Sequence, residues 1–197
     1  MKHEIAEALQ GKSIVASHAS LERAAKAYGE VLEKFCLEHE LPSEWFAHPD
    51  HLAVKCADRD HYRSVVEQAK PYSREMTEVP LNGRFLATAK LADMLSLGKY
   101  GEIDWLEIME PRPEMVGVDV VGVDHAEFYF ADFETVIDEL DIKNISFECQ
   151  SNPAHAWVSF QIADNLELKL NDAPLDDVVE HELAEKTARI IWQRGRR

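Results

Sequence analysis

Apolar and polar residues alternate along several short segments of the chain, and apolar residues recur at helical spacing between them. Alternation with a period of two predicts β-strands over 50–56, 84–91, 102–111, 123–130, 144–150, 156–162 and 166–172. A further strand is expected over 76–79, because the Asn82-Gly83 pair that follows it is typical of a tight hairpin. Apolar residues three and four positions apart predict helices over 21–38, 58–69, 132–140 and 175–193. The pattern therefore predicts an α+β fold.

Two short signatures recur at matching places in this order of elements. Asp50-His51 recurs as Asp124-His125, and each pair opens a strand that leads into a helix with an Asp at its N-terminus. The sequence DWLEI at 104–108 recurs as DNLEL at 164–168, each in the last strand of its group. Because the signatures recur in the same order, they indicate an internal duplication of one structural unit.

The duplicated unit has one strand, one helix and three further strands. We expect two such βαβββ modules, over 49–115 and 116–173, to form a curved mixed sheet around a cavity. Residues 1–48 are predicted to be an N-terminal helical segment that packs on this core, and residues 174–197 a C-terminal helix. The chain is then one compact structural unit.

The first and last strand of each module carry a histidine or a glutamate on the more polar face. These residues are His51, Glu107, His125 and Glu167, and the opposite face of each strand is apolar enough to pack under helices. Two imidazoles and two carboxylates suit a divalent first-row ion, namely Fe, Mn, Ni, Co or Zn, whereas Ca²⁺ prefers oxygen ligands alone. The sequence predicts a metal site with these four ligands. Glu110 is the alternate carboxylate if a bulge reverses the face at the end of its strand.

Basic residues share the same face by parity. Lys55 and Lys169 flank the predicted ligands, Arg84 follows the Asn-Gly turn, and Lys90 lies six residues further along. Cations around a metal favour a small anionic molecule, such as an oxo-acid whose carboxylate pairs with them. The alternative is that these residues are rim charges whose ends remain in solvent.

Charge and composition narrow the classes of partner. The formal net charge of −16 argues against binding to nucleic acids and to anionic membranes, since both need basic patches. Acidic runs such as 180–185 are interpreted as solvated surface. The three cysteines form no CxxC pair, and the N-terminal region has no long apolar run. A cytoplasmic protein with free thiols is therefore expected.

The chain resembles the YecM family of small bacterial proteins. That family lies within the vicinal-oxygen-chelate superfamily, which includes glyoxalase I, bleomycin-resistance proteins and extradiol dioxygenases. The matching stretches lie between about residues 50 and 180 and are DHLAVKC, LNGRFLATAKL, the strand leading to MEPRP, VDHAEFYF and LELKLNDAPLDDVV. The resemblance implies His51 and His125 as ligands. It also implies a set of substrate-binding residues on the cavity side, namely Lys55, Arg84, Lys90, Glu127 and Lys169.

The resemblance leaves the carboxylate ligands open. The family's Glu before its Pro-rich turn matches Glu110, whereas the wider superfamily and the internal repeat favour Glu107 and Glu167. We keep the latter pair as ligands and as candidate catalytic residues.

The implied activity is metal-dependent chemistry on a small oxygenated acid, as in an isomerase, a lyase or a dioxygenase. Four protein ligands with one displaceable Glu suit isomerisation, whereas three ligands and open positions suit oxygenation. The alternative is a non-catalytic protein that binds or sequesters a small molecule on the same fold. Whether the protein is a monomer or a homodimer is left open by the sequence.

Overall fold

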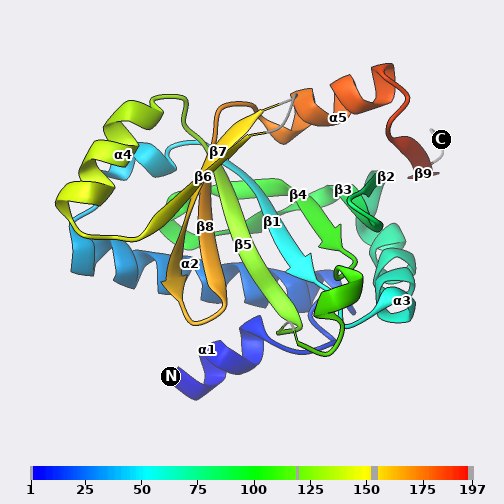
Figure 1. Ribbon diagram of the computed structural model, residues 1–197. Helices are drawn as coiled ribbons and strands as arrows, with labels where there is room; N and C mark the ends of the chain where they lie inside the picture. Colours follow the sequence, from blue (N-terminus) through cyan, green and yellow to red (C-terminus); the bar gives the residue numbers. More distant parts are fainter. Residues whose placement is uncertain (1, 119, 152–154, 195–197) are drawn as a thin grey trace.

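A computed structural model describes residues 2–118, 120–151 and 155–194 (Figure 1). Its helices are α1 (Lys2–Leu9), α2 (His18–His39), α3 (Arg59–Ala69), α4 (Phe133–Ile142) and α5 (Leu175–Ala184). Short 3-10 turns are η1 (Ser43–Phe46), η2 (Lys70–Tyr72), η3 (Gly98–Tyr100) and η4 (Pro113–Met115). The strands are β1 (Pro49–Lys55), β2 (Ser73–Leu81), β3 (Arg84–Ser96), β4 (Glu102–Met109), β5 (Gly122–Tyr129), β6 (Phe147–Ser151), β7 (Ala156–Ala163), β8 (Leu166–Asn171) and β9 (Arg189–Gln193).

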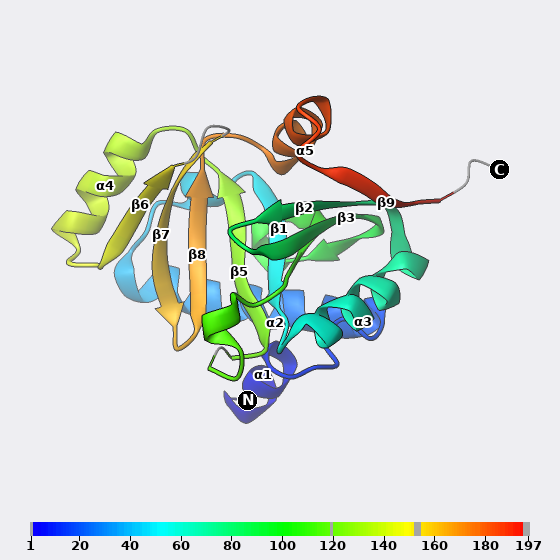
Figure 2. The ribbon, with the colours of Figure 1, turned by 45° about the vertical axis from the view of Figure 1, so that its right-hand side comes forward.

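The strands of the described residues form one sheet in the order β6-β7-β8-β5-β1-β4-β3-β2-β9. The first strands of the two modules, β1 and β5, lie antiparallel at its centre. Each is parallel to the last strand of its own module, β1 to β4 and β5 to β8. Figure 2 shows that the sheet is curved and does not close. The predicted α+β fold with two βαβββ modules and a curved mixed sheet is confirmed.

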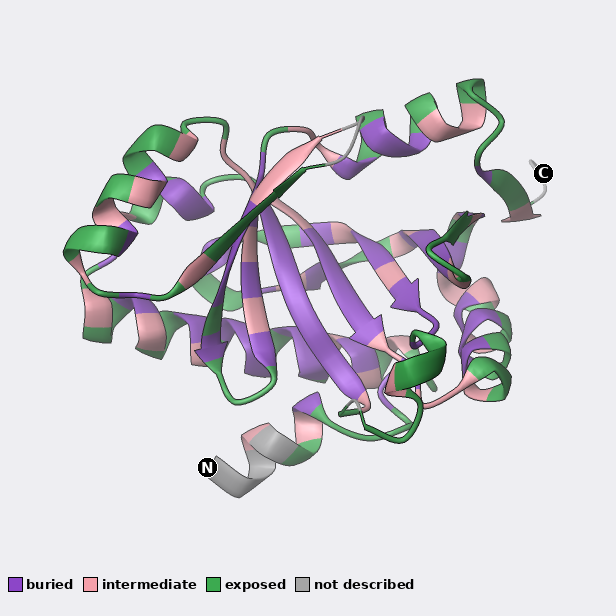
Figure 3. Cartoon of the chain, in the orientation of Figure 1, coloured by how far each residue is buried: buried purple, intermediate pink, exposed green. Residues whose placement is uncertain are grey.

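The two faces of the sheet have different coverings. Helices α1 to α4 pack on the convex face, where the apolar positions predicted from alternation are buried. Figure 3 shows that the central strand β5 is buried along nearly its whole length. Leu52, Leu106, Phe128 and Leu168 are fully buried in this core. Helix α5 instead packs against Trp105 on the concave face. No helix in the described ranges is both long enough and apolar enough to cross a membrane.

Local sequence signals act as predicted at the ends of the elements. The Asp58 side chain accepts a hydrogen bond from the backbone of His61 at the start of α3, and Asp132 does the same for Thr135 at the start of α4. Asn82 and Gly83 have φ angles of 52° and 79°, which a tight turn between β2 and β3 requires. The predicted hairpin is therefore confirmed.

The C-terminal segment differs from the expected helix over 175–193. Helix α5 ends at Ala184, and Arg189–Gln193 forms the edge strand β9, which pairs antiparallel with β2. Lys186 has a φ of 60°, so the backbone turns out of the helix there. The Arg189 guanidinium then pairs with Glu78 on β2. The helix prediction was wrong for this second half, and residues 195–197 lie outside the described residues.

Helix α2 approaches the chain after β3 so closely that only glycine fits at one position. A Cβ atom added at Gly29 would lie 2.4 Å from the backbone oxygen of Leu97. We expect Gly29→Ala to lower the free energy of unfolding by about 1–3 kcal/mol, because the backbone must shift to relieve the overlap. Urea unfolding measures this loss. Lys26→Ala, on the exposed side of α2, serves as the control and should change stability by less than about 0.5 kcal/mol.

Candidate metal centre

Two neighbouring rows of side chains cross the concave face of the sheet. In the first row, residues paired across β8, β5, β1 and β4 are Lys169, Glu127, His51 and Trp105. In the second row, the paired residues of the same strands are Glu167, His125, Ala53 and Glu107. Adjacent strands lie about 4.8 Å apart, and residues two apart in a strand share a face. The two rows therefore bring both histidines together at the centre of the sheet.

The Asp of each Asp-His pair occupies a β-bulge. Pro49 and His51 pair with the consecutive residues Phe128 and Glu127, so Asp50 is an extra residue in β1; Asp124 is the extra residue in β5. Each bulge turns its Asp toward the His that follows. Asp50 Oδ2 lies 3.0 Å from His51 Nδ1, and Asp124 Oδ2 lies 2.8 Å from His125 Nδ1. The carboxylates thereby fix each ring with Nε2 directed toward the centre.

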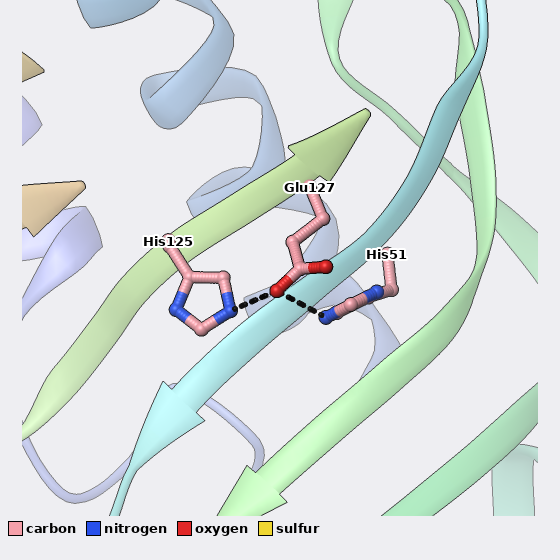
Figure 4. A group of neighbouring side chains, drawn as sticks. All are labelled: His51, His125 and Glu127. Atoms are coloured by element: carbon pink, nitrogen blue, oxygen red, sulfur yellow. Dashed lines mark ion pairs between the residues drawn. The ribbon is translucent and has the colours of Figure 1, made fainter. Parts of the chain in front are cut away.

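Glu127 lies between the two histidines, as Figure 4 shows. Its Oε1 atom is 3.2 Å from His125 Nε2 and 3.7 Å from His51 Nε2. The imidazole planes are inclined by 70° with ring centroids 5.7 Å apart. All three side chains are buried, with His125 fully excluded from solvent. These three residues form one of the groups in the described chain whose donor atoms are close enough together to hold an ion.

The electrostatics of the centre follow from this packing. Burial acts to lower the pKa of His51, but the charge of Glu127 and the hydrogen bond to Asp50 outweigh it and raise that pKa to about 9. Burial opposes ionisation of Glu127, yet the neighbouring His51, His125 and Lys169 hold its pKa well below the ordinary value. Asp124 is likewise buried, and its hydrogen bond to His125 keeps its pKa low.

Polar residues on β8 complete the surroundings of Glu127. The Asn171 amide donates to Glu127 Oε2 at 2.7 Å. Lys169 Nζ lies 3.1 Å from His125 Nε2 and 3.4 Å from Glu127 Oε1. An ammonium group thus lies beside two of the atoms that face the centre. Lys55 lies on β1, on the other side of β5, and its Nζ is 2.7 Å from Asp124 Oδ1.

The two glutamates of the recurring signature flank the histidines at different positions. Glu167 pairs directly with His125 across β8 and β5, whereas Glu107 pairs with Ala53, two residues beyond His51. The two signatures are therefore offset by two residues in the sheet, although both glutamates lie on the concave face. Glu107 Oε2 is 3.9 Å from His125 Nε2, and Glu167 Oε1 accepts a hydrogen bond from Gln161. Asp124, His125 and Glu167 form a second group of closely spaced donor atoms.

The predicted ligand Glu107 belongs to neither of the two groups of donor atoms, and three other predicted residues make their contacts away from the histidines. The Glu110 carboxylate pairs with Arg59 and accepts the backbone N–H of Phe85 at 2.8 Å. Arg84 donates to the backbone oxygen of Glu110. Lys90 lies one strand beyond Trp105, where its Nζ is 2.6 Å from Asp176 on α5. Of the predicted cations, Lys55 and Lys169 contact the aspartate and glutamate around the histidines.

Comparison with known proteins identifies the family of this chain. The model of the family described as YecM protein matches residues 18–189. The chain belongs to the YecM family. No curated protein matches the sequence.

Solved structures resemble this YecM-family protein in fold. The structural-genomics protein EC4020 has a TM-score of 0.63 at 14% sequence identity, over 79% of this chain and 87% of that chain. A methylmalonyl-CoA epimerase from Mycobacterium tuberculosis has a TM-score of 0.42 at 14% identity, over 66% and 91% of the respective chains. The hypothetical protein BH1468 from Bacillus halodurans C-125 has a TM-score of 0.45 at 12% identity, over 62% and 91%.

The donor atoms of the YecM-family centre fit a divalent ion. Ligand atoms around an ion held at about 2.1 Å lie roughly 3–4 Å apart, and the separations of 3.2 and 3.7 Å from Glu127 fall in this range. His51 Nε2 is buried and makes no hydrogen bond within the described part of the chain. Such an atom is costly to bury unless a partner satisfies it. Both Nδ1 atoms are already held by carboxylates, as is usual for metal-binding imidazoles.

Several polar residues around the centre have contacts that the sequence did not predict. The Asp-His repeat was recognised, but the bulges that turn Asp50 and Asp124 toward the histidines leave no separate signal in the sequence. Glu182 was included in a solvated acidic run, yet it continues the inward stripe of α5 that contains Val178 and Val179. Burial, together with the charge of Glu107, raises the pKa of Glu182. Its helical spacing from Val178 and Val179 was the signal that would have found it.

Proposed function

We propose that this YecM-family protein binds a divalent first-row metal ion and a small oxygenated acid at the centre formed by His51, His125 and Glu127. The observation that carries the proposal is the pair of buried imidazoles. Each is fixed through Nδ1 by its own aspartate, and both direct Nε2 toward one carboxylate oxygen. Mixed nitrogen and oxygen donors suit Fe, Mn, Ni, Co or Zn.

Glu107 and Glu167 flank these three ligands on the second row of side chains. In the proposal they supply a further ligand or accept a proton from the bound acid, in keeping with their positions beside His125. A bound ion would act as a Lewis acid toward the oxygens of the substrate. Lys169 and Lys55 then offer positive charge to the carboxylate of the acid, because they already contact the anionic side chains of the centre. Isomerisation, lyase chemistry and oxygenation all remain compatible with this donor set.

One observation favours a second candidate, a binding protein without catalysis. The ammonium group of Lys169 lies beside His125 Nε2 and Glu127 Oε1, where it supplies a built-in positive charge. In that case the same concave face holds an anionic molecule by Lys169 and Lys55 without any ion. The two candidates differ in whether the metal is needed for acid binding.

Titration of the metal-free protein with Co²⁺ tests the first candidate. We expect one ion per chain and visible absorption bands of a Co²⁺ site with nitrogen and oxygen ligands. Pyruvate is then added to the Co²⁺-loaded protein, and its binding should change those bands. If the protein binds no Co²⁺, the proposal fails. Equal affinity for pyruvate with and without the ion would instead favour the binding protein.

A further inference from the structure

Asn171 ends β8 on the concave face of the sheet, beside the histidine centre. It lies two residues beyond Lys169 and four beyond Glu167, so these three side chains share one face of the strand. In the sheet it pairs with Tyr129 on β5, which lies two residues beyond Glu127. Only 2% of Asn171 is exposed to solvent. A neutral polar side chain is therefore buried next to the proposed ligands.

The amide nitrogen of Asn171 holds two carboxylates of the centre. Nδ2 donates to Glu127 Oε2 at 2.7 Å and to Asp50 Oδ2 at 3.3 Å. An amide group has two N–H donors, so both are used. Asp50 is the residue that fixes the ring of His51 through Nδ1. One side chain thus connects the carboxylate between the histidines with the support of one imidazole.

All hydrogen bonds of the Asn171 side chain go to the centre. If its nitrogen and oxygen were exchanged, Oδ1 would face two carboxylate oxygens and be repelled by both, so the two carboxylates determine which way the amide points. In this orientation Oδ1 makes no hydrogen bond to any residue that the structure describes. A buried amide oxygen without a donor is unfavourable for stability. The side chain is therefore better suited to the centre than to the packing of the sheet.

The two oxygens of Glu127 have different neighbours because of this hydrogen bond. Oε1 lies 3.2 Å from His125 Nε2 and 3.7 Å from His51 Nε2, and Figure 4 shows both ion pairs ending on this one oxygen. Oε2 is the oxygen that accepts from Asn171. A carboxylate can bind an ion through one oxygen or through both. Because the amide holds Oε2, Glu127 offers a single oxygen to the space between the imidazoles.

Asp50 depends less on Asn171 than Glu127 does. The backbone N–H of Leu175, at the start of α5, donates to Asp50 Oδ1 at 3.0 Å. Asp50 therefore keeps a hydrogen-bond donor, and His51 keeps its support, when Asn171 is replaced. Replacement of Asn171 then acts mainly on Glu127, whose Oε2 is released.

We propose that Asn171 is a positioning residue, which holds Glu127 as a ligand with one oxygen and so leaves positions on the ion open for the acid. This role rests on the proposed function, because it requires both the ion and the acid. An acid that binds an ion through two neighbouring oxygens, such as a 2-oxo-acid, needs two open positions. Glu127 would occupy one of them if it bound through both of its oxygens.

Asn171→Leu tests this role, since leucine has nearly the shape of asparagine but no donor. We expect the full-length variant to bind one Co²⁺ per chain, and pyruvate to bind the loaded variant roughly tenfold more weakly than the wild type. Before pyruvate is added, the visible bands of the bound Co²⁺ should be weaker, because their intensity falls as the coordination number rises. A merely structural role would leave these bands unchanged. Gln150→Leu on the exposed strand β6 removes an amide that donates to Glu148, and should match the wild type.

Asn171→Ala separates the hydrogen bond from packing. Alanine leaves space for a water molecule among polar groups, and that water can donate to Glu127 Oε2 in place of the amide. The affinity of the loaded Asn171→Ala protein for pyruvate should therefore lie between those of Asn171→Leu and the wild type. A packing role predicts the reverse order, because alanine leaves a cavity that leucine fills. Weaker pyruvate binding in Asn171→Ala than in Asn171→Leu would overturn the inference.

The outcomes distinguish this inference from the proposed function. If the wild type binds Co²⁺ and pyruvate, and Asn171→Leu binds pyruvate equally well, the inference is overturned while the proposed function stands. If the wild type binds no Co²⁺, or the loaded wild type binds no pyruvate, the proposed function fails and the inference with it. Circular dichroism shows whether each variant is folded. Should Asn171→Leu not fold, the bands of Co²⁺ in Asn171→Ala decide, and wild-type bands and pyruvate affinity there would overturn the inference.

Discussion

Replacing both His51 and His125 with alanine is expected to abolish stoichiometric metal binding. The two Nε2 atoms are the nitrogen donors of the centre, and both are buried beside Glu127. With both removed, only carboxylates remain around the centre and no nitrogen donor is left, so we expect the affinity for Co²⁺ to fall by about three orders of magnitude or more. Calorimetric titration of the metal-free proteins measures the change. His181→Ala, on the exposed side of α5, should bind as the wild type does.

Retention of one ion per chain by the double variant would move the metal site elsewhere. Loss of binding is informative only if the variant remains folded, which circular dichroism and thermal unfolding establish. Comparison of Glu127→Gln with Glu107→Gln and Glu167→Gln then separates the carboxylates. We expect the largest loss in Glu127→Gln, because its Oε1 lies within 3.7 Å of both imidazole Nε2 atoms. A larger loss in Glu107→Gln or Glu167→Gln would instead favour the ligand set predicted from the repeat.

Alternation of apolar and polar residues predicted the sheet because burying the wrong face of a strand would be strongly unfavourable. One face of each strand is buried under helices, so a wrong face would place Leu106 or Leu168 in solvent and a glutamate in the core. The duplicated order of elements then predicted which strands begin and end each module. In the sheet, the first strands of the two modules, β1 and β5, pair with each other at the centre.

The sequence predicted which face of the sheet each side chain occupies, but it did not predict how far neighbouring strands are shifted along one another. Side chains repeat with a period of two, so sliding a strand by two residues leaves every face unchanged. The signatures that contain Glu107 and Glu167 align in sequence, yet in the sheet they differ by such a shift. Alternation predicted correctly that both glutamates lie on the concave face. It gave no information on which of them pairs with a histidine.

The bulges and the C-terminal strand depend on tertiary contacts that local patterns do not encode. Asp50 turns toward His51 because the extra residue in β1 is accommodated against β5, and it is also held by the N-terminus of α5, 125 residues away in sequence. Similarly, Arg189–Gln193 can pair with β2 because β2 is the outermost strand of the first module in the sheet. The helical spacing of apolar residues alone had predicted that the helix continues through this segment. Long-range pairing overrides such local preferences.

The Lys169→Met substitution is expected to change metal binding and acid binding in opposite directions. Lys169 Nζ lies 3.1 Å from His125 Nε2 and 3.4 Å from Glu127 Oε1, so an incoming ion must displace the ammonium group. Two unit charges about 4 Å apart near a protein surface repel by about 4 kcal/mol. Because the lysine side chain turns away as the ion enters, only part of this repulsion remains. We therefore expect Co²⁺ to bind roughly tenfold more tightly to the variant.

The same substitution should weaken binding of pyruvate to the Co²⁺-loaded protein by about tenfold, since it removes a cation that faces the carboxylate of the acid. Lys143→Met, on the other side of the sheet at the end of α4, loses the same unit of charge and serves as the matched control. Calorimetry of both ligands against both variants gives the comparison. Tighter binding of both ligands to Lys169→Met would contradict a role for Lys169 in orienting the acid. Weaker binding of Co²⁺ would mean that Lys169 supports the metal centre, and the arrangement of donors around His125 would then need revision.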